Sequence, residues 1–469
     1  MDMIENKTFD ELKPGDTACL VRTLTPKDIE VFAIMSGDVN PSHVDDAFAK
    51  SNMFHEVVAH GMWSASLIST VLGTQLPGPG TIYVDQSLHF HRPVGLGDTI
   101  TVTVKVTRKI KETHRVIFDC RASNQEDKEV VTGTAEVVAP LEKVSRPRVV
   151  LPEIELRKRG HHCELLIEKA GIHNPLRTAV VHPVDTASLL GAVEAARAKL
   201  IVPIFVGPEA KIRAAAAQAE LDLTPYKIVS TEHSDAAAEK AVAMAQTGEV
   251  EALMKGALYT MDLMRAVIND NHSLRTDRRM SHVFVIDVPD YPRQLFITDA
   301  AINIFPSLAD KRDIVQNAID LAHALGIEQP RVALLSAMEA VTEKFRSTVD
   351  AAALCKMVDR GQITGGLLDG PLAFDTAVSE EAAKTKGLLS QVAGRADIFV
   401  VPDIEAGNML AKQLEYLADA EVSGIVLGAR VPIILTSATD TMLSRLASCA
   451  IALLQARHKK TKGRAKIKL

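Results

Sequence analysis

The stretch His60-Gly-Met-Trp-Ser-Ala-Ser-Leu-Ile-Ser-Thr-Val-Leu72 predicts the helix that decides the fold of the first third of the chain. Its residues are apolar or small on nearly every side, which is typical of a helix that is buried all round. Strand patterns then follow one another at 82–90, 99–107, 113–122 and 129–138. This order favours antiparallel strands that enclose one helix.

The loop before this helix, Ser36-Gly-Asp-Val-Asn-Pro-Ser-His43, carries the residues with the clearest chemistry. Thr25-Pro26 predicts a helix start and Gly37 its end, so Asp38 stands on irregular backbone. A carboxylate and an imidazole on a constrained loop can activate one water molecule. The alternative is a helix end with Asp and Asn in turn positions and a solvated histidine.

Three segments resemble the MaoC-type or (R)-specific enoyl-CoA hydratase family. The resemblance implies the hotdog fold, in which a sheet curls around one helix. It implies that Asp38 and His43 are the catalytic pair and that the amide of Gly61 holds a thioester carbonyl. It also implies that Ser69 lines the substrate pocket. The segments are Ser36-Gly-Asp-Val-Asn-Pro-Ser-His-Val-Asp-Asp-Ala-Phe48, Val58-Ala-His-Gly-Met62 and His91-Arg-Pro-Val-Gly-Leu-Gly-Asp98.

These residue types suit the addition of water to an α,β-unsaturated thioester. Asp38 and His43 can share one water, deprotonate it for attack at C3 and return a proton to C2; each such transfer contributes about 10²–10⁴-fold. A helix that starts at Gly61 presents free backbone N–H groups to the enolate oxygen. Asn40 can orient the pair or contact the substrate.

Four other positions have ordinary structural interpretations. His60 is expected to cap or pack rather than to act directly. His89 and His91 alternate on a strand like a pair of metal ligands, but no third ligand is obvious, so no metal site is predicted. Ser69 fits equally well as a small residue at a close helix contact.

After a proline-containing linker at 143–154, helices rich in alanine alternate with short runs of β-branched residues. This alternation predicts a mainly parallel sheet covered by helices on both faces. No P-loop motif occurs and no GxGxxG follows a strand, which leaves a dehydrogenase on a related two-lobed fold as a weak alternative. The predicted strands include 179–181, 201–206, 283–286, 332–335, 398–401 and 433–435.

Six segments in this second region carry a family resemblance together: Leu253–Gly256, Leu274–His282, Thr298–Asn303, Gly361–Pro371, Val400–Asn408 and Gly428–Ser437. In this order they resemble the phosphate acetyl/butyryltransferase family. The resemblance implies two α/β/α lobes, similar to isocitrate dehydrogenase, with the active site in the cleft between them. It also implies acyl transfer between CoA and inorganic phosphate by direct attack, without a covalent acyl-enzyme.

Three basic residues of these segments are candidate ligands for phosphate. By the resemblance, Lys255, Arg275 and Arg278 contact phosphate or the phosphate groups of CoA, because arginine forks match phosphate oxygens. The alternative for each of them is a solvated surface charge.

The sequence Thr436-Ser-Ala-Thr-Asp440 follows the apolar run 433–435, at the strand end where ligands of open α/β sheets bind. Thr436, Ser437 and Asp440 are therefore candidate substrate contacts. Members of the family commonly carry an arginine where this chain has Ala438. Loss of a charge-assisted contact costs about 1.5–3 kcal/mol. The transferase is then slower, uses a neighbour such as Arg430, or has lost activity.

Composition limits the remaining choices. The net charge of -6 argues against a general nucleic-acid binder, and the five cysteines form no CxxC motif, as expected of reduced thiols in a cytoplasmic protein. No signal pattern and no long apolar run occur. The basic residues of 459–469 are expected to form a solvated tail.

The sequence thus predicts a hotdog domain at 1–142, a linker at 143–154, a two-lobed transferase domain at 155–458 and the tail. The expected function is bifunctional: hydration of trans-2-enoyl-CoA to (R)-3-hydroxyacyl-CoA, and acyl transfer between CoA and phosphate. CoA thioesters and phosphate are substrates, and no tightly bound cofactor is implied. A homo-oligomer is expected by resemblance. The alternative is an active hydratase fused to a silent transferase-fold module for CoA binding or assembly.

Overall fold

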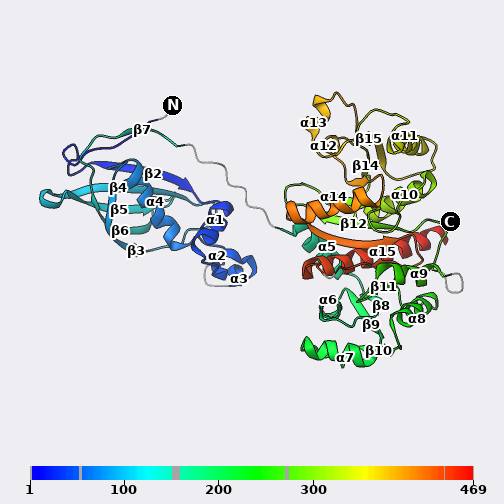
Figure 1. Cartoon of the computed structure of the whole chain (residues 1–469). Helices are drawn as coiled ribbons and strands as arrows, with labels where there is room; N and C mark the ends of the chain where they lie inside the picture. Colours follow the sequence, from blue (N-terminus) through cyan, green and yellow to red (C-terminus); the bar gives the residue numbers. More distant parts are fainter. Residues whose placement is uncertain (1–2, 52–54, 150–158, 270–273, 438, 468–469) are drawn as a thin grey trace. The chain divides into compact units, whose positions relative to one another are not determined.

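The computed structural model describes residues 3–51, 55–149, 159–269, 274–437 and 439–467, with side chains up to residue 461. The chain divides into two compact units, Met1–Leu156 and Arg157–Leu469. Figure 1 labels the elements of both units. Within the described residues, no helix combines the length and the apolar composition that crossing a membrane requires.

The first unit is a five-stranded antiparallel sheet with helix α4 (Gly61–Thr74) packed against it (Figure 1). Trp63, Ile68 and Leu72 of α4 are buried in one cluster with Val102 and Phe118 of the sheet. Full burial of each such side chain stabilises the fold by about 1.5–3 kcal/mol. The predicted hotdog architecture is confirmed, but the helix is not buried on every side as expected, because Met62, Ser66 and Ser69 on its other face are exposed. The strands, in pairing order, are β2 (Thr17–Thr23), β4 (Thr99–Ile110), β5 (Arg115–Ser123), β6 (Glu129–Val138) and β3 (Ile82–Phe90).

The strand boundaries differ from the prediction at one hairpin. Strand β4 continues to Ile110, and the residues 111–113 form a 3-10 turn rather than the start of β5. A register shift near Val106 changes the pairing, so that Ile110 lies opposite Arg115. The bulge adds a residue that a simple alternation of apolar and polar positions does not reveal.

Part of the predicted linker is ordered within the first unit. Strand β7 (Ser145–Pro147) pairs with β1 (Met3–Glu5) in antiparallel register. The side chain of Asn6 donates to the Glu142 carbonyl at 2.8 Å and accepts from the Val144 amide at 2.9 Å. The ordered first unit therefore extends beyond residue 142, while residues 150–154 lie outside the described residues.

The second unit contains an eleven-stranded sheet covered by helices, and the predicted α/β class is confirmed. The strands in pairing order are β10 (Lys227–Ser230), β9 (Ile201–Gly207), β8 (Leu176–Val181), β11 (Ala252–Lys255), β18 (Ile433–Ile434), β17 (Glu421–Leu427), β12 (Ser281–Asp287), β13 (Leu295–Thr298), β16 (Ile398–Val400), β14 (Arg331–Leu335) and β15 (Leu367–Leu372).

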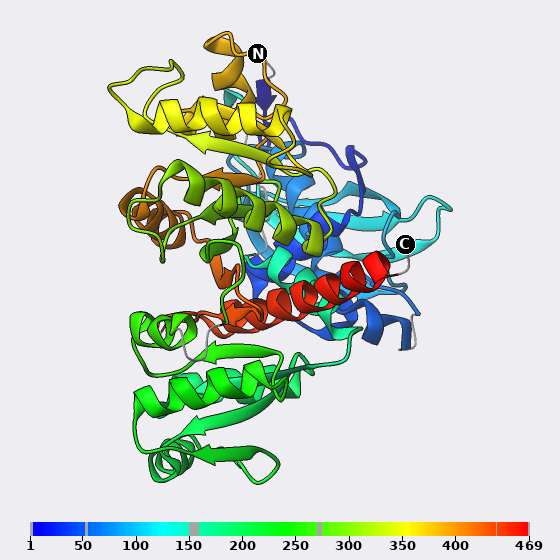
Figure 2. The same ribbon diagram turned by 90° about the vertical axis from the view of Figure 1, so that its right-hand side faces the viewer.

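Helices lie on both faces of this sheet (Figure 2). They are α5 (His161–Gly171), α6 (Thr186–Arg197), α7 (Glu209–Gln218), α8 (Ser234–Gln246), α9 (Thr260–Ile268), α10 (Leu308–Leu325), α11 (Arg346–Asp359), α12 (Phe374–Val378), α13 (Glu380–Thr385), α14 (Ile404–Leu417) and α15 (Met442–Ile467).

Strand direction reverses in the middle of the sheet. β8, β9, β10, β11 and β18 are parallel to one another, whereas β17 is antiparallel to both β18 and β12. Strands β13 to β16 then run in the same direction as β17. Because loops that bind ligands follow the carboxyl ends of strands, the two groups of strands offer such loops at opposite edges of the sheet.

The prediction of a solvated tail at 459–469 is wrong for the residues that helix α15 includes. This helix extends to Ile467 and crosses the middle of the second unit (Figure 2). Arg457 donates to Glu251 at 3.0 Å, and Lys460 of the predicted tail also donates to Glu251. Burial raises the pKa of Glu251, but the bonds from Lys460 and Arg457 outweigh it and hold that pKa at about 2. The start of the basic segment is thus docked on the sheet.

We expect Glu251→Gln to lower the melting temperature of the second unit by a few degrees at pH 7. The folded-state pKa lies below the ordinary value, so the stabilisation is complete above the unfolded pKa of 4.5 and is lost as the pH falls toward 2. Calorimetry from pH 7 to pH 3 should show the difference from wild type shrinking. Glu249→Gln is the matched control, because Glu249 pairs with Lys227 at the surface. Equal stability of both variants at pH 7 would contradict the docking of this helix.

Candidate functional site

Two tight turns hold the Asp38 loop in the first unit. Helix α1 (Pro26–Ser36) ends at Gly37, which has a φ of 74° that glycine adopts easily. Helix α2 (Pro41–Val44) begins at once, with the Asn40 side chain accepting from the Ser42 amide at 3.1 Å. The carboxylate of Asp38 accepts from the Asn40 amide at 3.2 Å. Asn40 therefore serves as a helix cap that fixes the loop.

The hydrogen bonds of His43 determine which ring nitrogen is basic. Its Nδ1 lies 2.8 Å from the Val58 carbonyl oxygen and must donate, because a carbonyl only accepts. The Nε2 of the neutral ring therefore carries a lone pair. Side-chain atoms of Asp38, His43 and His60 all lie within 4.8 Å of one another. The predicted Asp38–His43 pair is thus close enough to share one water molecule.

His60 has more contacts with this site than a capping or packing role requires. The residue is 2% exposed, and its Nε2 donates to the main-chain carbonyl of Asp38 at 2.9 Å. Its ring stacks on that of His43 with centroids 4.0 Å apart, and Phe32 lies on it at 5.0 Å. It makes no side-chain cap bond to α4. Sequence reasoning underrated this residue, although its place directly before Gly61 was a signal.

The geometry of the two histidines favours proton transfer over metal binding. A metal ion lies near the plane of each imidazole that binds it, along the lone pair of the nitrogen. The rings of His43 and His60 are inclined by only 33° with their centroids 4.0 Å apart, an arrangement nearer to stacking than to two rings that point their nitrogens at one ion. His91 donates to or accepts from Thr132 Oγ1 at 2.7 Å. Among the described residues, no metal-ligand group includes His89 or His91.

Gly61 is the first residue of α4, so its amide has no carbonyl partner one turn earlier. The residue is exposed, and a Cβ added to it would lie 3.3 Å from the Phe90 ring. A residue with a side chain at position 61 would therefore crowd the Phe90 ring. Ser69 is exposed on the same helix, eight residues further on, or about 12 Å along the axis. The predicted role of Ser69 in lining the substrate pocket stays a prediction.

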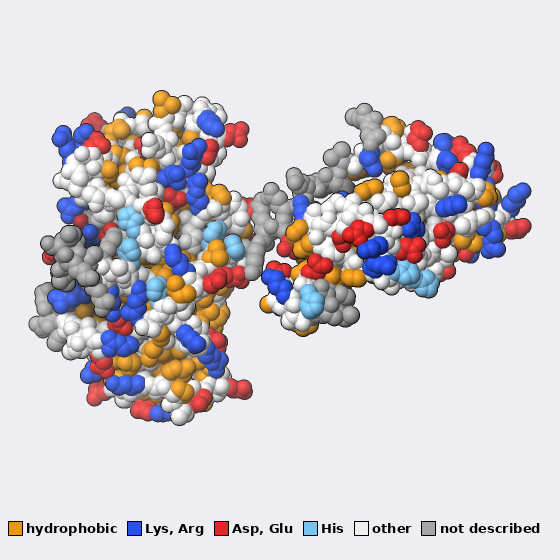
Figure 3. All heavy atoms as spheres, turned by 180° about the vertical axis from the view of Figure 1, so that it is seen from behind, with side chains coloured by type: hydrophobic (Ala, Val, Ile, Leu, Met, Phe, Trp, Pro, Cys, Tyr) orange, Lys and Arg blue, Asp and Glu red, His pale blue; other side chains and the backbone are white. Residues whose placement is uncertain are grey.

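Apolar side chains surround this site at the surface. Several large ones are exposed on α1, on the loop after it, on α2, on α3 (Asp46–Ser51), at the start of α4 and at the end of β3, and Figure 3 shows hydrophobic side chains on the surface of the first unit. An open, apolar surround can accept the acyl part of a thioester or a second protein chain. The exposed residues are Ile34, Met35, Val39, Val44, Phe48, Met62 and Phe90.

In the second unit, Lys255 and Thr436 meet at the edge where β11 and β18 end. The Thr436 hydroxyl donates to the Lys255 carbonyl at 3.4 Å, and the Lys255 ammonium donates to the Gly256 and Leu258 carbonyls at 3.2 Å. Burial lowers the pKa of Lys255, while the carboxylates of Asp185 and Asp440 raise it. A half-buried cation therefore faces two acids at this strand end.

Ser437 and Asp440 form a compact turn beside Lys255. The Ser437 amide donates to the Asp440 carboxylate at 2.7 Å, and the Ser437 and Thr439 hydroxyls lie 3.1 Å apart. Burial raises the pKa of Asp440, although the Ser437 amide and Arg445 lower it in part. Asp440 can thus take or give a proton nearer to neutral pH than an exposed carboxyl. Ala438 lies outside the described residues.

Arg445 is a residue that sequence reasoning missed. It is 4% exposed in the first turn of α15, and its guanidinium donates to the Ser437 carbonyl at 2.6 Å and the Asp440 carbonyl at 3.3 Å. Its Cδ would lie 3.0 Å from a Cβ on Gly191. The available signal was an arginine in the first turn of α15, directly before the mostly apolar run 446–454.

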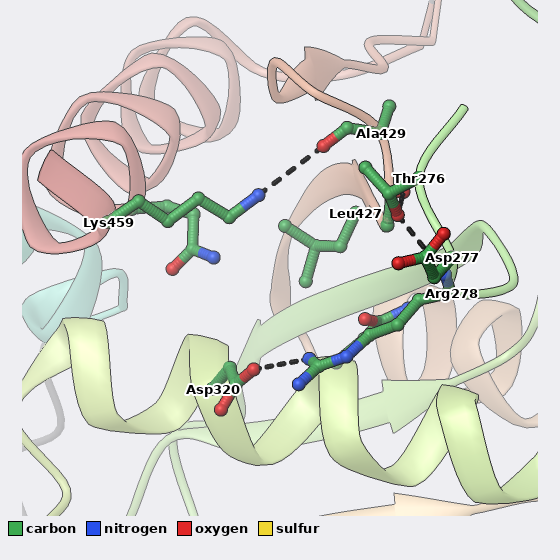
Figure 4. Close-up of a pocket in the computed structure, with 10 residues that line it drawn as sticks. Thr276, Asp277, Arg278, Asp320, Leu427, Ala429 and Lys459 are labelled. Carbon is green, nitrogen blue, oxygen red and sulfur yellow. Dashed lines mark hydrogen bonds and ion pairs between the residues drawn. The ribbon is translucent and has the colours of Figure 1, made fainter. Parts of the chain in front are cut away.

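The structure does not bring Arg275 and Arg278 to this cluster. Arg275 pairs with Ala429, beyond the end of β17, and Arg278 binds Asp320 at 2.5 Å. Because β17 is antiparallel to β18, this is the opposite edge of the sheet from Thr436. Figure 4 shows Arg278 at a cavity of its own. The residues that were expected to bind phosphate therefore lie at two opposite edges of the sheet.

Comparison with known proteins agrees with the division of the chain into two units. The MaoC like domain family matches residues 15–129, and the phosphate acetyl/butaryl transferase family matches residues 235–453. The chain is 60% identical over 291 residues to a phosphate acetyltransferase of Rhizobium meliloti, covering 62% of this chain and 92% of that protein.

Two solved structures extend the comparison. A branched-chain phosphotransacylase from Enterococcus faecalis V583 shares 30% identity and a TM-score of 0.54, covering 60% of this chain and all of that one. The R-hydratase PhaJ1 from Pseudomonas aeruginosa shares 43% identity with a TM-score of 0.32, covering 33% of this chain and 99% of that one. The chain belongs to the phosphate acetyl/butyryltransferase family and carries a MaoC-like domain in its first unit.

Proposed function

We propose that this chain is a bifunctional acyl-CoA enzyme. Its first unit hydrates trans-2-enoyl-CoA to 3-hydroxyacyl-CoA, in the (R) form as the name of the Pseudomonas relative suggests. Its second unit transfers an acyl group between CoA and inorganic phosphate. The observation that carries the hydratase activity is that His43, whose Nε2 carries a lone pair, and the Asp38 carboxylate belong to one group of side chains with atoms within 4.8 Å of one another. The third member of this group is His60, directly before the Gly61 amide at the start of α4.

Hydration needs a base, a proton donor and a partner for the enolate oxygen. In the proposed mechanism, Asp38 and His43 hold one water, remove its proton as oxygen attacks C3, and return a proton to C2. The Gly61 amide donates to the thioester oxygen as negative charge develops there. One such donor stabilises a transition state by about 2.7–4 kcal/mol. His60 acts as a positioning residue, because it contacts both members of the pair.

For the transferase, the half-buried Lys255 and the hydroxyls of Thr436 and Ser437 are proposed to hold phosphate oxygens. A phosphate oxygen attacks the thioester carbonyl, the C–S bond breaks, and Asp440 passes a proton to the departing sulfur. In the reverse direction, the same carboxylate removes the proton of the CoA thiol. Arg445 fixes the turn that carries Ser437 and Asp440. CoA thioesters and phosphate are substrates here rather than bound cofactors.

A second candidate function keeps the hydratase and makes the second unit a CoA-binding or assembly module. The observation that favours it is Ala438, because the families' usual arginine would add a cation beside Ser437. We further propose a homo-oligomer, supported by the exposed apolar residues around the first site. The five free thiols support a cytoplasmic location, where thiols stay reduced.

We expect Asp38→Asn to slow the hydration of crotonyl-CoA by about 10²-fold or more. The amide keeps the shape of the side chain but cannot accept the proton of water. The measurement is loss of the absorbance of the conjugated thioester. Asp46→Asn is the control, because it removes an exposed acid from the same segment. Full activity in Asp38→Asn, or none in wild type, would refute the hydratase assignment.

We expect His60→Ala to reduce kcat for hydration by about 10²-fold with a small change in KM, since a displaced pair loses rate rather than substrate affinity. His60→Gln should recover part of this loss, because its amide can still donate to the Asp38 carbonyl. Steady-state kinetics of both variants separate kcat from KM. An unchanged kcat in His60→Ala would show that the residue only packs.

Acetyl-CoA or butyryl-CoA should release CoA only when phosphate is present. We expect Ala438→Arg to lower the KM for phosphate about tenfold or more, because the variant adds one charge-assisted contact. A thiol reagent measures the free CoA. If wild type and variant both leave the two acyl-CoAs intact, the second unit is a binding module and the transferase proposal fails. Because the hydratase site lies in the other unit, the control for folding is an unchanged thermal melting transition of the second unit in Ala438→Arg.

A further inference from the structure

A cavity of about 380 Å³ lies at the edge of the second unit where β17 ends. Its walls come from the segment before β12, from α10, from the residues after β17 and from α15. Figure 4 shows Lys459 and Arg278 reaching the cavity from opposite walls, with Asp277 and Asp320 beside Arg278. None of these side chains has a part in the two sites described above.

The two cations of the cavity can offer donors to a ligand. Arg278 binds Asp320 through Nη1 at 2.5 Å, and the other N–H groups of its planar fork can bind further oxygens. Lys459 donates to the Ala429 carbonyl at 3.4 Å, a long and weak contact for an ammonium group. Burial lowers the pKa of Lys459, the carboxylate of Asp320 raises it in part, and the charge of Arg278 lowers it further, so an anion between the two cations would stabilise both.

One wall of the cavity is buried and polar, and one of its hydrogen-bonding groups has no partner among the described residues. Asn317 and Gln455 line it and are 3% and 2% exposed. The Asn317 amide donates to the Arg279 carbonyl and to Ser281 Oγ at 2.9 Å. By contrast, Gln455 Oε1 has no hydrogen-bond partner among the described residues. A buried acceptor of this kind costs about 1–3 kcal/mol unless a donor satisfies it.

Carboxylates and cations side by side select for an ion that both accepts and donates hydrogen bonds. A phosphate group near its second ionisation, at a pH of about 6, carries such a proton together with acceptor oxygens. Its oxygens can accept from Arg278 and Lys459 while its P–OH donates to Asp277 or Asp320. Sulfate has the same shape but carries no proton at this pH, so the two acids would repel it.

We propose that this cavity binds the phosphate group of a small ligand, either inorganic phosphate or a phosphate monoester. The site is distinct from the place of acyl transfer, because it opens at the opposite edge of the sheet from Lys255 and Thr436. Helix α15 connects the two edges, with Arg445 at one and Lys459 at the other. The proposal stands whether or not the second unit is an active transferase.

Crystals of the full chain, soaked at pH 6 in separate drops with inorganic phosphate, glycerol 3-phosphate and sulfate at equal concentration, test the site. Density for a phosphate group between Arg278 and Lys459, without density in sulfate, is the expected result. Inorganic phosphate alone, the ester alone, or both give the source of the group. Equal occupancy by sulfate would mean an adventitious ion only, and empty density in all three drops would also overturn the proposal.

A solution measurement with variants supports the soak. Calorimetric titration with the ligand that binds in the crystal should show about tenfold or greater loss of affinity in Lys459→Gln, because a charge-assisted contact is removed. Lys460→Gln is the matched control on the same helix, where the lysine pairs with Glu251. Unchanged affinity in Lys459→Gln, with the cavity still occupied in the crystal, would overturn the assignment of the cation.

Discussion

Burial of α4 inside the curled sheet is the constraint on which the hydratase site depends. The buried face of this helix fixes its first turn, which presents the Gly61 amide, and fixes His60 directly before it. His60 in turn contacts Asp38 and His43, while the Val58 carbonyl fixes the tautomer of His43. The proposed catalytic pair and the proposed partner of the enolate oxygen, which are separate in sequence, are thereby held in place by one packing interaction.

In the second unit, the reversal of strand direction decides at which edge of the sheet the candidate residues lie. Since β17 lies antiparallel between β18 and β12, the strands of the two halves end at opposite edges of the sheet. The edge at β11 and β18 gathers Lys255, Ser437 and Asp440 with the clamp of Arg445. The other edge holds Arg278 and Lys459 around a separate cavity. Basic residues at the two edges of one sheet can therefore serve different ligands.

Sequence patterns predicted both folds because burial shows in the sequence. It appears as the apolar composition of α4 and as the alternation of strands and helices in the second unit. They also singled out Asp38 and His43, which lie five residues apart and whose side chains have atoms within 4.8 Å of each other. They did not place Arg275 and Arg278, since the edge that a residue occupies depends on strand pairing at long range. Arg445 and His60 were missed or underrated because their roles come from contacts with main-chain carbonyls. The basic end of α15 was misread because its partner, Glu251, is distant in sequence.

A crystal structure of the full chain with a non-reactive analogue of trans-2-enoyl-CoA tests the central claim most directly. We predict that the thioester oxygen lies within hydrogen-bonding distance of the Gly61 amide, with C3 facing the His43 Nε2 and the Asp38 carboxylate. An analogue bound only in the second unit, or bound in the first unit with its thioester away from Gly61, would contradict it.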